Sequence, residues 1–300
     1  MNRTIRTDLA LEAEALWRES QGVSGAPEGV RARRETRGGF AVTTVEVTSA
    51  SGEAALGKPL GKYVTVELDA LIRREENAFP EACEVLADTL RPLLPLAPGD
   101  ACLVVGLGNR EITPDAVGPD AVDCVMVTRH LTEQMPEDFG ALRPVCAVCS
   151  GVLGTTGIES SALVRAVAAS VKPAAVVAID ALASRNPDRL CRTVQIADTG
   201  IVPGSGVGNT RAALNQETLG LPVIAVGVPT VVDAATLTLD LAARAGLSPD
   251  PAAFGEAGGM IVTPREIDKN VRDVAKLIGY SLNLALHDGL RIEDVDMFLS

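Results

Sequence analysis

Histidine and aromatic residues are scarce in this sequence. Its 300 residues include only two histidines, His130 and His287, and aromatic residues make up 3% of the chain. Any mechanism that pairs histidine with a serine or cysteine nucleophile would therefore depend on one of these two side chains. Because large rings are rare, the core must consist of Val, Leu, Ile and Ala, which suits a parallel sheet covered by helices on both faces.

Long hydrophobic runs and a secretory signal are also missing. Hydrophobic residues account for 47% of the chain, but no stretch approaches the ~20 consecutive apolar residues that cross a bilayer. No basic segment followed by an apolar one opens the sequence, so we expect a cytoplasmic protein that does not enter a membrane. The six cysteines lie mostly in apolar runs. Because the cytoplasm keeps thiols reduced, we expect them to be small core residues.

Basic residues are fewer than acidic ones, and the formal net charge is −12. Nucleic-acid binding requires a basic surface that neutralises phosphates, so the composition argues against a direct nucleic-acid partner. An acidic surface suits a basic or disordered partner protein instead. A non-catalytic binding module for such a partner is one hypothesis that the composition permits.

One apolar stretch, residues 101–107, organises the rest of the chain and is followed by Gly108 and Asn109. A short apolar run without alternation predicts a strand that is buried on both faces. Asp115 follows this strand closely. In open α/β sheets, ligands and chemistry gather beyond the carboxyl ends of the strands. Asp115 is therefore a candidate functional residue.

The hydrophobic pattern predicts an α/β fold with a mainly parallel central sheet flanked by helices, in a single domain over residues 1–300. Two strands with alternating patterns predict a small antiparallel β element in the N-terminal third. Segments 21–39 and 247–259 are expected to be loops, the second of them mobile. The expected strands are residues 40–47, 62–68, 101–107, 144–149, 174–179, 191–197 and 221–227. The expected helices are residues 8–19, capped by Asp8, and 81–94, 115–130, 158–170, 230–245 and 264–287.

A second aspartate, Asp180, follows another buried strand, residues 174–179. At that junction its carboxylate either caps the next helix or faces the crevice beyond the strand ends. If the strands that precede Asp115 and Asp180 are neighbours, the two carboxyl groups converge. Close carboxyl groups do not both ionise easily, so one keeps a proton while the other acts as a base. Such a pair can activate water against a peptide carbonyl.

Two cysteines and a glycine-rich segment each lack part of the pattern that they resemble. Cys146 and Cys149 have redox spacing, but they lie in an apolar strand rather than at an exposed helix start, which favours buried strand residues. The glycine-rich segment at residues 204–209 lacks the spacing of a phosphate loop, and it is no nucleophile elbow because Pro203 and Val207 stand where glycines are needed. Its backbone N–H groups can still serve a substrate carbonyl.

Two further similarities are also incomplete. The segment Gly106–Gly108 begins like a dinucleotide-binding loop, but Glu111 stands where the third glycine belongs and would repel a pyrophosphate. An oxidoreductase is therefore discounted. The segment Asp198–Gly200 matches the triplet of pepsin-like proteases, but the chain has one copy in an α/β context. A turn after the strand at residues 191–197 is the preferred interpretation.

The motifs form an ordered series over about residues 100–290. Their segments are residues 106–109, 113–119, 127–130, 150–152, 156–159, 178–183, 198–201, 203–209, 227–233, 260–264 and 266–268. In number and order they resemble the spore germination protease family, the endopeptidases that degrade small acid-soluble spore proteins when spores germinate.

This resemblance implies an α/β fold, a homotetramer, and an aspartic-type endopeptidase whose two catalytic aspartates match Asp115 and Asp180. It implies small acid-soluble spore proteins as substrates and the spore core as the location, and we expect no metal or cofactor. Family members are zymogens that remove an N-terminal leader just before a segment like residues 6–12, so residues 1–6 are an expected short leader. The residues expected to bind substrate or support the pair are Asn109, His130, Asp198, Gly204, Ser205 and Gly206.

The opening motif also resembles the hydrogenase maturation endopeptidases, in which a strand is followed by Gly-x-Gly-Asn and an acidic residue. Those enzymes use carboxylates and a histidine to recognise a metal bound to their substrate. His130 is the plausible counterpart in this chain. This alternative and the acidic binding module stay open beside the spore protease hypothesis.

Overall fold

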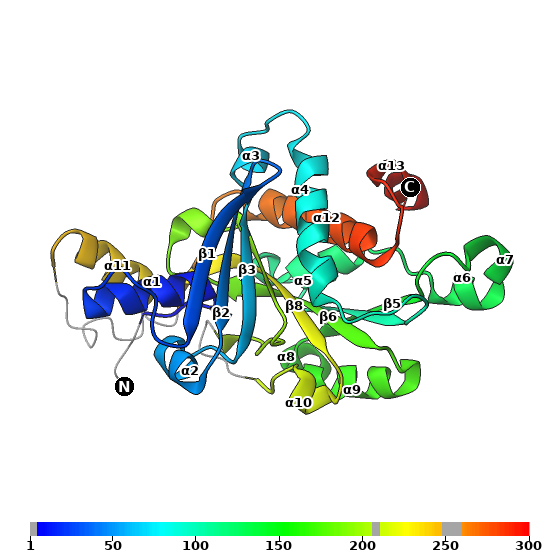
Figure 1. Cartoon of the computed structure of the whole chain (residues 1–300), viewed down its shortest axis with the longest axis horizontal. Helices are drawn as coiled ribbons and strands as arrows, with labels where there is room; N and C mark the ends of the chain where they lie inside the picture. The colour runs from blue at the N-terminus through cyan, green and yellow to red at the C-terminus, as the bar shows by residue number, and fades with distance from the viewer. Residues whose placement is uncertain (1–4, 206–210, 248–259, 300) are drawn as a thin grey trace.

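The computed structural model describes residues 5–205, 211–247 and 260–299 of the chain (Figure 1). Strands and helices alternate along most of these ranges. The strands are β1 (Val30–Arg37), β2 (Phe40–Val47), β3 (Gly61–Glu67), β4 (Cys102–Leu107), β5 (Val145–Gly151), β6 (Ala175–Ala183), β7 (Thr193–Ala197), β8 (Val223–Asp233) and β9 (Ile261–Val262). The longer helices are α1 (Ala10–Gln21), α2 (Ala50–Leu56), α4 (Ala78–Leu90), α9 (Ser160–Val171), α11 (Ala234–Arg244), α12 (Ile267–Leu286) and α13 (Ile292–Leu299). The shorter helices are α3 (Asp69–Ile72), α5 (Val117–Val122), α6 (Arg129–Gln134), α7 (Pro136–Phe139), α8 (Leu153–Thr156) and α10 (Gln216–Leu219), with 3₁₀ turns η1 (Arg91–Leu93), η2 (Thr113–Asp115) and η3 (Pro187–Arg189).

The strands form one mixed sheet in the order β1-β2-β3-β7-β8-β6-β4-β5, with β9 paired to β8. Strands β5, β4, β6 and β8 are parallel to one another. Strands β1, β2, β3 and β7 are joined to each other and to β8 by antiparallel pairing. The predicted α/β fold with a parallel centre and an N-terminal antiparallel element is confirmed. The antiparallel part is larger than expected because β1 and β7 join β2 and β3.

Helices cover both faces of the parallel strands. Helices α4, α5 and α12 share a core with one face, and α9 packs on the other (Figure 1). Along β4 the side chains alternate, so that Val104 points to the α12 side and Val105 to the α9 side. Because both faces are covered, an uninterrupted apolar strand is stable here. Helix α1 covers the antiparallel part, where Ala10 lies in one cluster with Val45.

Two of the element predictions were wrong. Residues 21–39 were expected to be a loop, but they contain β1, an edge strand whose charged residues are mostly exposed and show no alternation. Residues 115–130 were expected to form one helix, but α5 ends at Val122 and α6 starts at Arg129. Between them, Asn283 of α12 accepts a hydrogen bond from the Met126 N–H at 2.8 Å and donates one to the Cys124 carbonyl at 2.9 Å. These contacts replace helical hydrogen bonds.

Three strand predictions also need correction. Strand β6 continues through Asp180 to Ala183 because residues 181–183 still pair with β8, which itself runs on to Asp233. The cysteines of β5 were expected to be buried, but Cys149 is exposed because β5 is an edge strand. Of the loop expected at residues 247–259, residues 248–259 lie outside the described ranges.

Candidate functional site

The carboxyl ends of β4 and β6 lie side by side and bring Asp115 and Asp180 to one cavity. The two strands are parallel neighbours, with Gly106 of β4 opposite Ile179 of β6. Asp115 ends the turn η2 that follows β4, and Asp180 is the residue after Ile179. Both line a cavity of about 370 Å³. The structure therefore brings together the two aspartates that the sequence singled out.

The loop after β4 is folded back onto Asp115. Gly108 adopts a φ of +108°, and a Cβ atom there would lie 2.0 Å from the Asp115 carbonyl oxygen. The next residue, Asn109, donates its backbone N–H to Asp115 Oδ2 at 2.7 Å. A side chain at position 108 would therefore push the loop off the carboxylate that Asn109 holds.

Asp180 has a different environment, because its side chain projects from the middle of a covered strand. The residue is 4% exposed, and Oδ1 accepts a hydrogen bond from the Ala181 N–H at 3.0 Å. Burial raises the pKa of Asp180 well above its ordinary value, and the nearby negative charges of Asp115 and Asp8 raise it further, whereas the Ala181 N–H opposes the shift. Asp180 therefore favours its protonated form.

Asp115 is the more acidic partner of the pair. Burial also raises the pKa of Asp115 above its ordinary value. The hydrogen bond from the Asn109 N–H favours the charged form and offsets part of this increase. The pair titrates as a unit, and its first ionisation places the negative charge on the carboxyl group with the better solvation. That group is Asp115. The arrangement places a carboxyl group with a strongly raised pKa and a more acidic carboxyl group in one cavity, as an acid and base pair requires.

The cavity is lined by residues from several parts of the chain. Leu107 and Ile112 come from the β4 end, Leu153 from α8, and Ile261 from β9. Its described lining includes one basic side chain, Arg211, which lies 3.5 Å from the Glu159 carboxylate. The sequence motifs did not point to Arg211.

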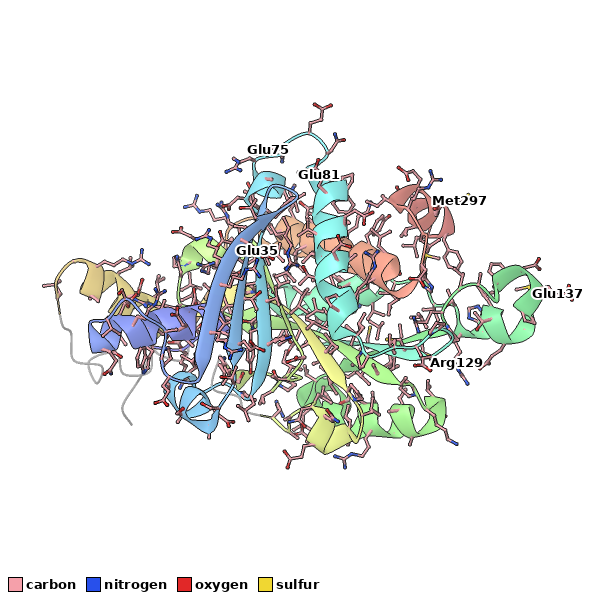
Figure 2. The ribbon with its side chains drawn as sticks, in the orientation of Figure 1. Glu35, Glu75, Glu81, Arg129, Glu137 and Met297 are labelled. Carbon is pink, nitrogen blue, oxygen red and sulfur yellow. The ribbon has the colours of Figure 1, made fainter. Side chains whose placement is uncertain are left out.

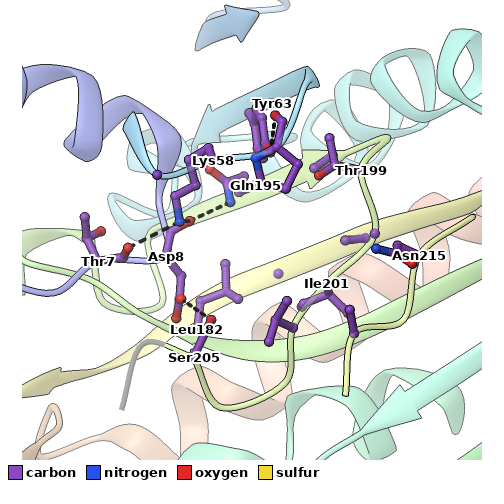
Figure 3. A pocket seen from close by; sticks show the side chains of 18 of the residues that line it. Thr7, Asp8, Lys58, Tyr63, Leu182, Gln195, Thr199, Ile201, Ser205 and Asn215 are labelled. Carbon is purple, nitrogen blue, oxygen red and sulfur yellow. Dashed lines mark hydrogen bonds between the residues drawn. The ribbon is translucent and has the colours of Figure 1, made fainter. Parts of the chain in front are cut away.

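A second cavity of about 640 Å³ adjoins the first, and the two share Asp8 and Leu182 as lining residues (Figure 3). Lys58 and Gln195 reach into it beside the N-terminal segment, and Ser205 closes one side. We refer to the two adjoining cavities together as the cleft, and Asp8 lies where they meet.

Asp8 was expected to cap α1, but its carboxylate points into this cleft instead. The capping position is Leu9, and no side chain caps the helix. Asp8 Oδ1 accepts a hydrogen bond from the Ser205 hydroxyl at 2.7 Å, and Oδ2 accepts one from the Ala183 N–H at 2.8 Å. The Asp8 N–H donates to the Ala183 carbonyl oxygen at 2.9 Å. The N-terminal segment is thus attached to the end of β6, beside Asp180.

Lys58 and Glu12 hold the same segment from its other sides. Lys58 Nζ donates to the Asp8 carbonyl oxygen at 2.9 Å and to that of Thr7 at 3.3 Å. Burial lowers the pKa of Lys58, while the charges of Asp8 and Glu12 act in the opposite direction. Glu12 is buried and accepts a hydrogen bond from the Thr7 hydroxyl. The motif over residues 6–12 was the one sequence signal that pointed to this segment.

The other expected site residues fall into two groups. Asn109 and Gly204 line the smaller cavity, and Ser205 lines the larger one. Gly206 lies outside the described residues. His130 and Asp198 are exposed and line neither cavity.

The locations of His130 and Asp198 in the fold explain why both lie apart from the Asp115–Asp180 pair. His130 was expected near the end of a helix, but it lies in the first turn of α6, beside Arg129 at the projecting end of the molecule (Figure 2). Asp198 follows β7 and accepts a hydrogen bond from the Lys62 N–H at 2.7 Å, which links the ends of β7 and β3. The turn that the sequence favoured for residues 198–200 is observed.

In the described ranges, no group of three or more His, Cys, Asp or Glu side chains is arranged to hold a metal ion. None of the helices in these ranges is both long enough and apolar enough to cross a bilayer.

A sequence profile of the germination protease family matches residues 8–243, a range that includes Asp115, Asp180 and most of the residues that line the cleft. The chain belongs to this family. The resemblance drawn from the sequence motifs is thereby confirmed, and with it the assignment as a protease. A germination protease from Clostridium tetani is 39% identical over 99% of this chain and 100% of its own length. One from Caldanaerobacter subterraneus is 40% identical over 98% of each chain. One from Priestia megaterium is 38% identical over 95% of this chain and 94% of its own.

Among solved structures, the NiFe hydrogenase maturation protease HycI from Thermococcus kodakarensis overlaps with 66% of this germination protease family member and 98% of its own chain. The TM-score is 0.35 and the sequence identity is 19%. A similarity of this size says nothing about the activity of this chain.

Proposed function

We propose that this protein is an endopeptidase that initiates the degradation of small acid-soluble spore proteins during germination, and that Asp115 and Asp180 activate the attacking water. The observation that carries the proposal is the pair of carboxyl groups in one cavity, with Asp180 buried and its pKa raised in part by Asp115. Two carboxyl groups with different proton affinities can supply an acid and a base together.

In the proposed mechanism, Asp115 starts ionised and Asp180 starts protonated. Asp115 takes a proton from water as the water oxygen attacks the carbonyl carbon of the scissile bond. Asp180 gives its proton to the carbonyl oxygen, which produces a neutral tetrahedral diol. Asp115 then passes its proton to the amide nitrogen, the C–N bond breaks, and a diol hydroxyl returns a proton to Asp180. Both carboxyl groups end in their starting states.

Asn109, Gly204 and Ser205 are the proposed supporting residues. The Asn109 N–H keeps Asp115 in place, and the backbone at Gly204 and Ser205 lies on the wall of the cleft, where it can bind a substrate main chain. Gly206 stays a proposal on the basis of the sequence alone. His130 and Asp198 have no part in this mechanism because they are exposed and line neither cavity.

The same proposal covers the location, oligomeric state and processing of the enzyme. We place the enzyme in the spore core as a homotetramer made of single peptidase domains, residues 1–300, which work without a metal or cofactor. Residues 1–6 are the proposed leader of a zymogen. The hydrogen bond from the Ala183 N–H to Asp8 supports this proposal, because it holds residue 8 close to Asp180 at the end of β6.

Digestion of a purified small acid-soluble spore protein, followed by mass spectrometry of the fragments, tests the function. We expect the wild type to produce a small set of defined fragments. Asp115→Asn and Asp180→Asn should each lower kcat by about 10³-fold or more, because each removes one proton-transfer group from a pair that acts as a unit.

Asp88→Asn is the matched control, because Asp88 lies on the exposed side of α4 in an ion pair with Arg91. Its activity should equal that of the wild type. Full activity of both cavity variants would refute the mechanism. A stable complex with intact spore protein and no fragments after long incubation would support the binding-module hypothesis instead.

A further inference from the structure

Arg110 attaches the catalytic loop, residues 108–116, to helix α5. Its guanidinium binds both carboxylate oxygens of Asp123, with Nη2 3.0 Å from Oδ1, and Nη1 lies 3.4 Å from Asp120 Oδ1. Nη2 also donates to the Pro119 carbonyl oxygen at 3.1 Å. A bidentate contact fixes the orientation of the guanidinium as well as its position.

Helix α5 is a firm anchor because its first turn touches the strands without intervening side chains. A Cβ atom on Gly118 would lie 2.2 Å from the Leu107 carbonyl oxygen and 2.6 Å from that of Ile179. A Cβ atom on Gly106 would lie 2.5 Å from the Gly118 carbonyl oxygen. The helix also packs against α12. Residues of α5 therefore keep a fixed position relative to the ends of β4 and β6.

The other hydrogen bonds of the catalytic loop are local. The Asn109 carbonyl oxygen accepts from the Ile112 N–H at 3.1 Å, and the Ile112 carbonyl oxygen accepts from the Asp115 N–H at 2.7 Å. These bonds shape the turn without attaching it to the rest of the protein. Within the described part of the chain, the hydrogen bonds and ion pairs that join residues 109–112 to other segments come from Arg110.

We propose that Arg110 is a positioning residue of the peptidase site, which keeps the Asn109 N–H on the Asp115 carboxylate by holding the catalytic loop against α5. The inference rests on the proposed function of Asp115. Arg110 does not line the cavity, so it acts through Asn109 rather than on the substrate. Its Nη2 also lies 3.9 Å from the Cys149 thiol at the end of β5, which extends the attachment to the neighbouring strand.

The effect of charge on the pKa of Asp115 can be separated from the effect of loop attachment by comparing substitutions of Arg110 with a substitution of its partner Asp123. Replacing Arg110 leaves extra negative charge near the site and also loosens the loop, and both effects raise the pKa of Asp115. Replacing Asp123 by asparagine loosens the loop but removes a negative charge. Charge alone would then lower the pKa of Asp115, whereas loss of the Asn109 hydrogen bond would raise it. The ionisable groups that face the attachment and the site are Asp120 of α5, Asp123 just after α5, Cys149 of β5, Arg272 of α12, Asp180 of β6, Asp8, Glu159 and Arg211.

The first experiment measures kcat/KM against pH for Arg110→Ala, Arg110→Lys and Asp123→Asn. We expect Arg110→Ala to lower kcat/KM about tenfold, because a small misplacement of a catalytic group is costly, and to move the acid limb of the profile to higher pH. Arg110→Lys should fall between Arg110→Ala and the wild type, since an ammonium cannot make the bidentate contact. Asp123→Asn should also move the acid limb to higher pH. A shift to lower pH, or an unchanged profile in Arg110→Ala, would overturn the inference.

The second experiment does not depend on activity. Hydrogen exchange read by mass spectrometry should be faster over residues 108–116 in both Arg110 variants, and unchanged in Arg129→Ala, which removes a partly exposed arginine paired with Glu133 in α6 (Figure 2). Equal exchange in all proteins would also overturn the inference. A wild type that cleaves no substrate would instead refute the proposed function, while exchange would still report on the attachment.

Discussion

At the scale of single residues, the site depends on how closely the backbone approaches itself at Gly108. The φ of +108° is rare for residues with a side chain, and the space where a Cβ atom would lie is taken by the Asp115 carbonyl oxygen. The glycine therefore serves two purposes. It permits the turn, and it lets the turn close on the carboxylate.

Gly108→Ala should destabilise the protein by about 3 kcal/mol, since backbone strain and the clash with Asp115 add together. Gly99→Ala is the control, because Gly99 also has a positive φ, of +81°, but has no atom within 4 Å of the Cβ position. We expect the control to cost about 1 kcal/mol. Urea unfolding at neutral pH measures both values. Equal losses in the two variants would show that the clash contributes nothing.

The candidate pair was within reach of the sequence because each aspartate follows a continuous apolar strand. Neighbouring parallel strands end at the same edge of a sheet, so the convergence of Asp115 and Asp180 follows from the strand order. Asp8 and Arg110 were not within reach. Their partners lie elsewhere in the chain or depend on the exact path of a loop, and hydrophobic periodicity carries no information about either.

At the scale of elements, the N-terminal segment and α1 are held by a buried carboxylate in addition to the apolar packing of α1 on the antiparallel strands. Glu12 accepts hydrogen bonds from the N–H groups of Arg185 at 2.7 Å and Asn186 at 3.1 Å, and it lies 3.4 Å from the Arg189 guanidinium. These donors belong to the chain that follows β6. Glu12 therefore connects α1 to the strand that carries Asp180.

Glu12→Ala should lower the free energy of unfolding by about 3 kcal/mol, because it leaves two partly buried N–H groups without an acceptor. Glu53→Ala, in the exposed first turn of α2, is the control and should change stability by about 0.5 kcal/mol. The midpoints of urea unfolding give the comparison. A loss in Glu12→Ala no larger than that of the control would mean that water replaces the carboxylate at this position.

The elements that the sequence predicted correctly are those whose burial is simple. The buried strand β4 and the helix α12 have strong apolar patterns. Strand β1 was missed because an exposed edge strand has no apolar face to reveal it. Helix α5 was predicted too long because its end is set by Asn283, which lies in a distant helix.

At the scale of the whole molecule, the proposed catalytic acid reduces stability. The pKa of Asp180 is raised well above 3.8 in the folded protein, whereas an unfolded aspartate titrates at about 3.9. Between these two values, the folded state holds a proton that the unfolded state has released. The free energy of unfolding therefore falls as the pH rises through this window, and it is level above the folded-state pKa.

Asp180→Asn should remove this part of the pH dependence. The variant should be more stable than the wild type at neutral pH, and the difference should shrink as the pH falls toward the ordinary pKa of aspartate. Urea unfolding over a pH series measures the difference, with Asp88→Asn as an exposed control. Parallel curves for the wild type and Asp180→Asn would contradict the raised pKa.

The attachment of Asp8 also has a consequence for the order of folding. Its partners Ala183 and Ser205 lie 175 and 197 positions further along the chain. A ribosome makes the N-terminal segment long before either partner exists, and closing so long a loop costs more chain entropy than forming local turns. The N-terminal segment therefore joins the sheet late, and the cleft takes its final shape only after synthesis has passed residue 205.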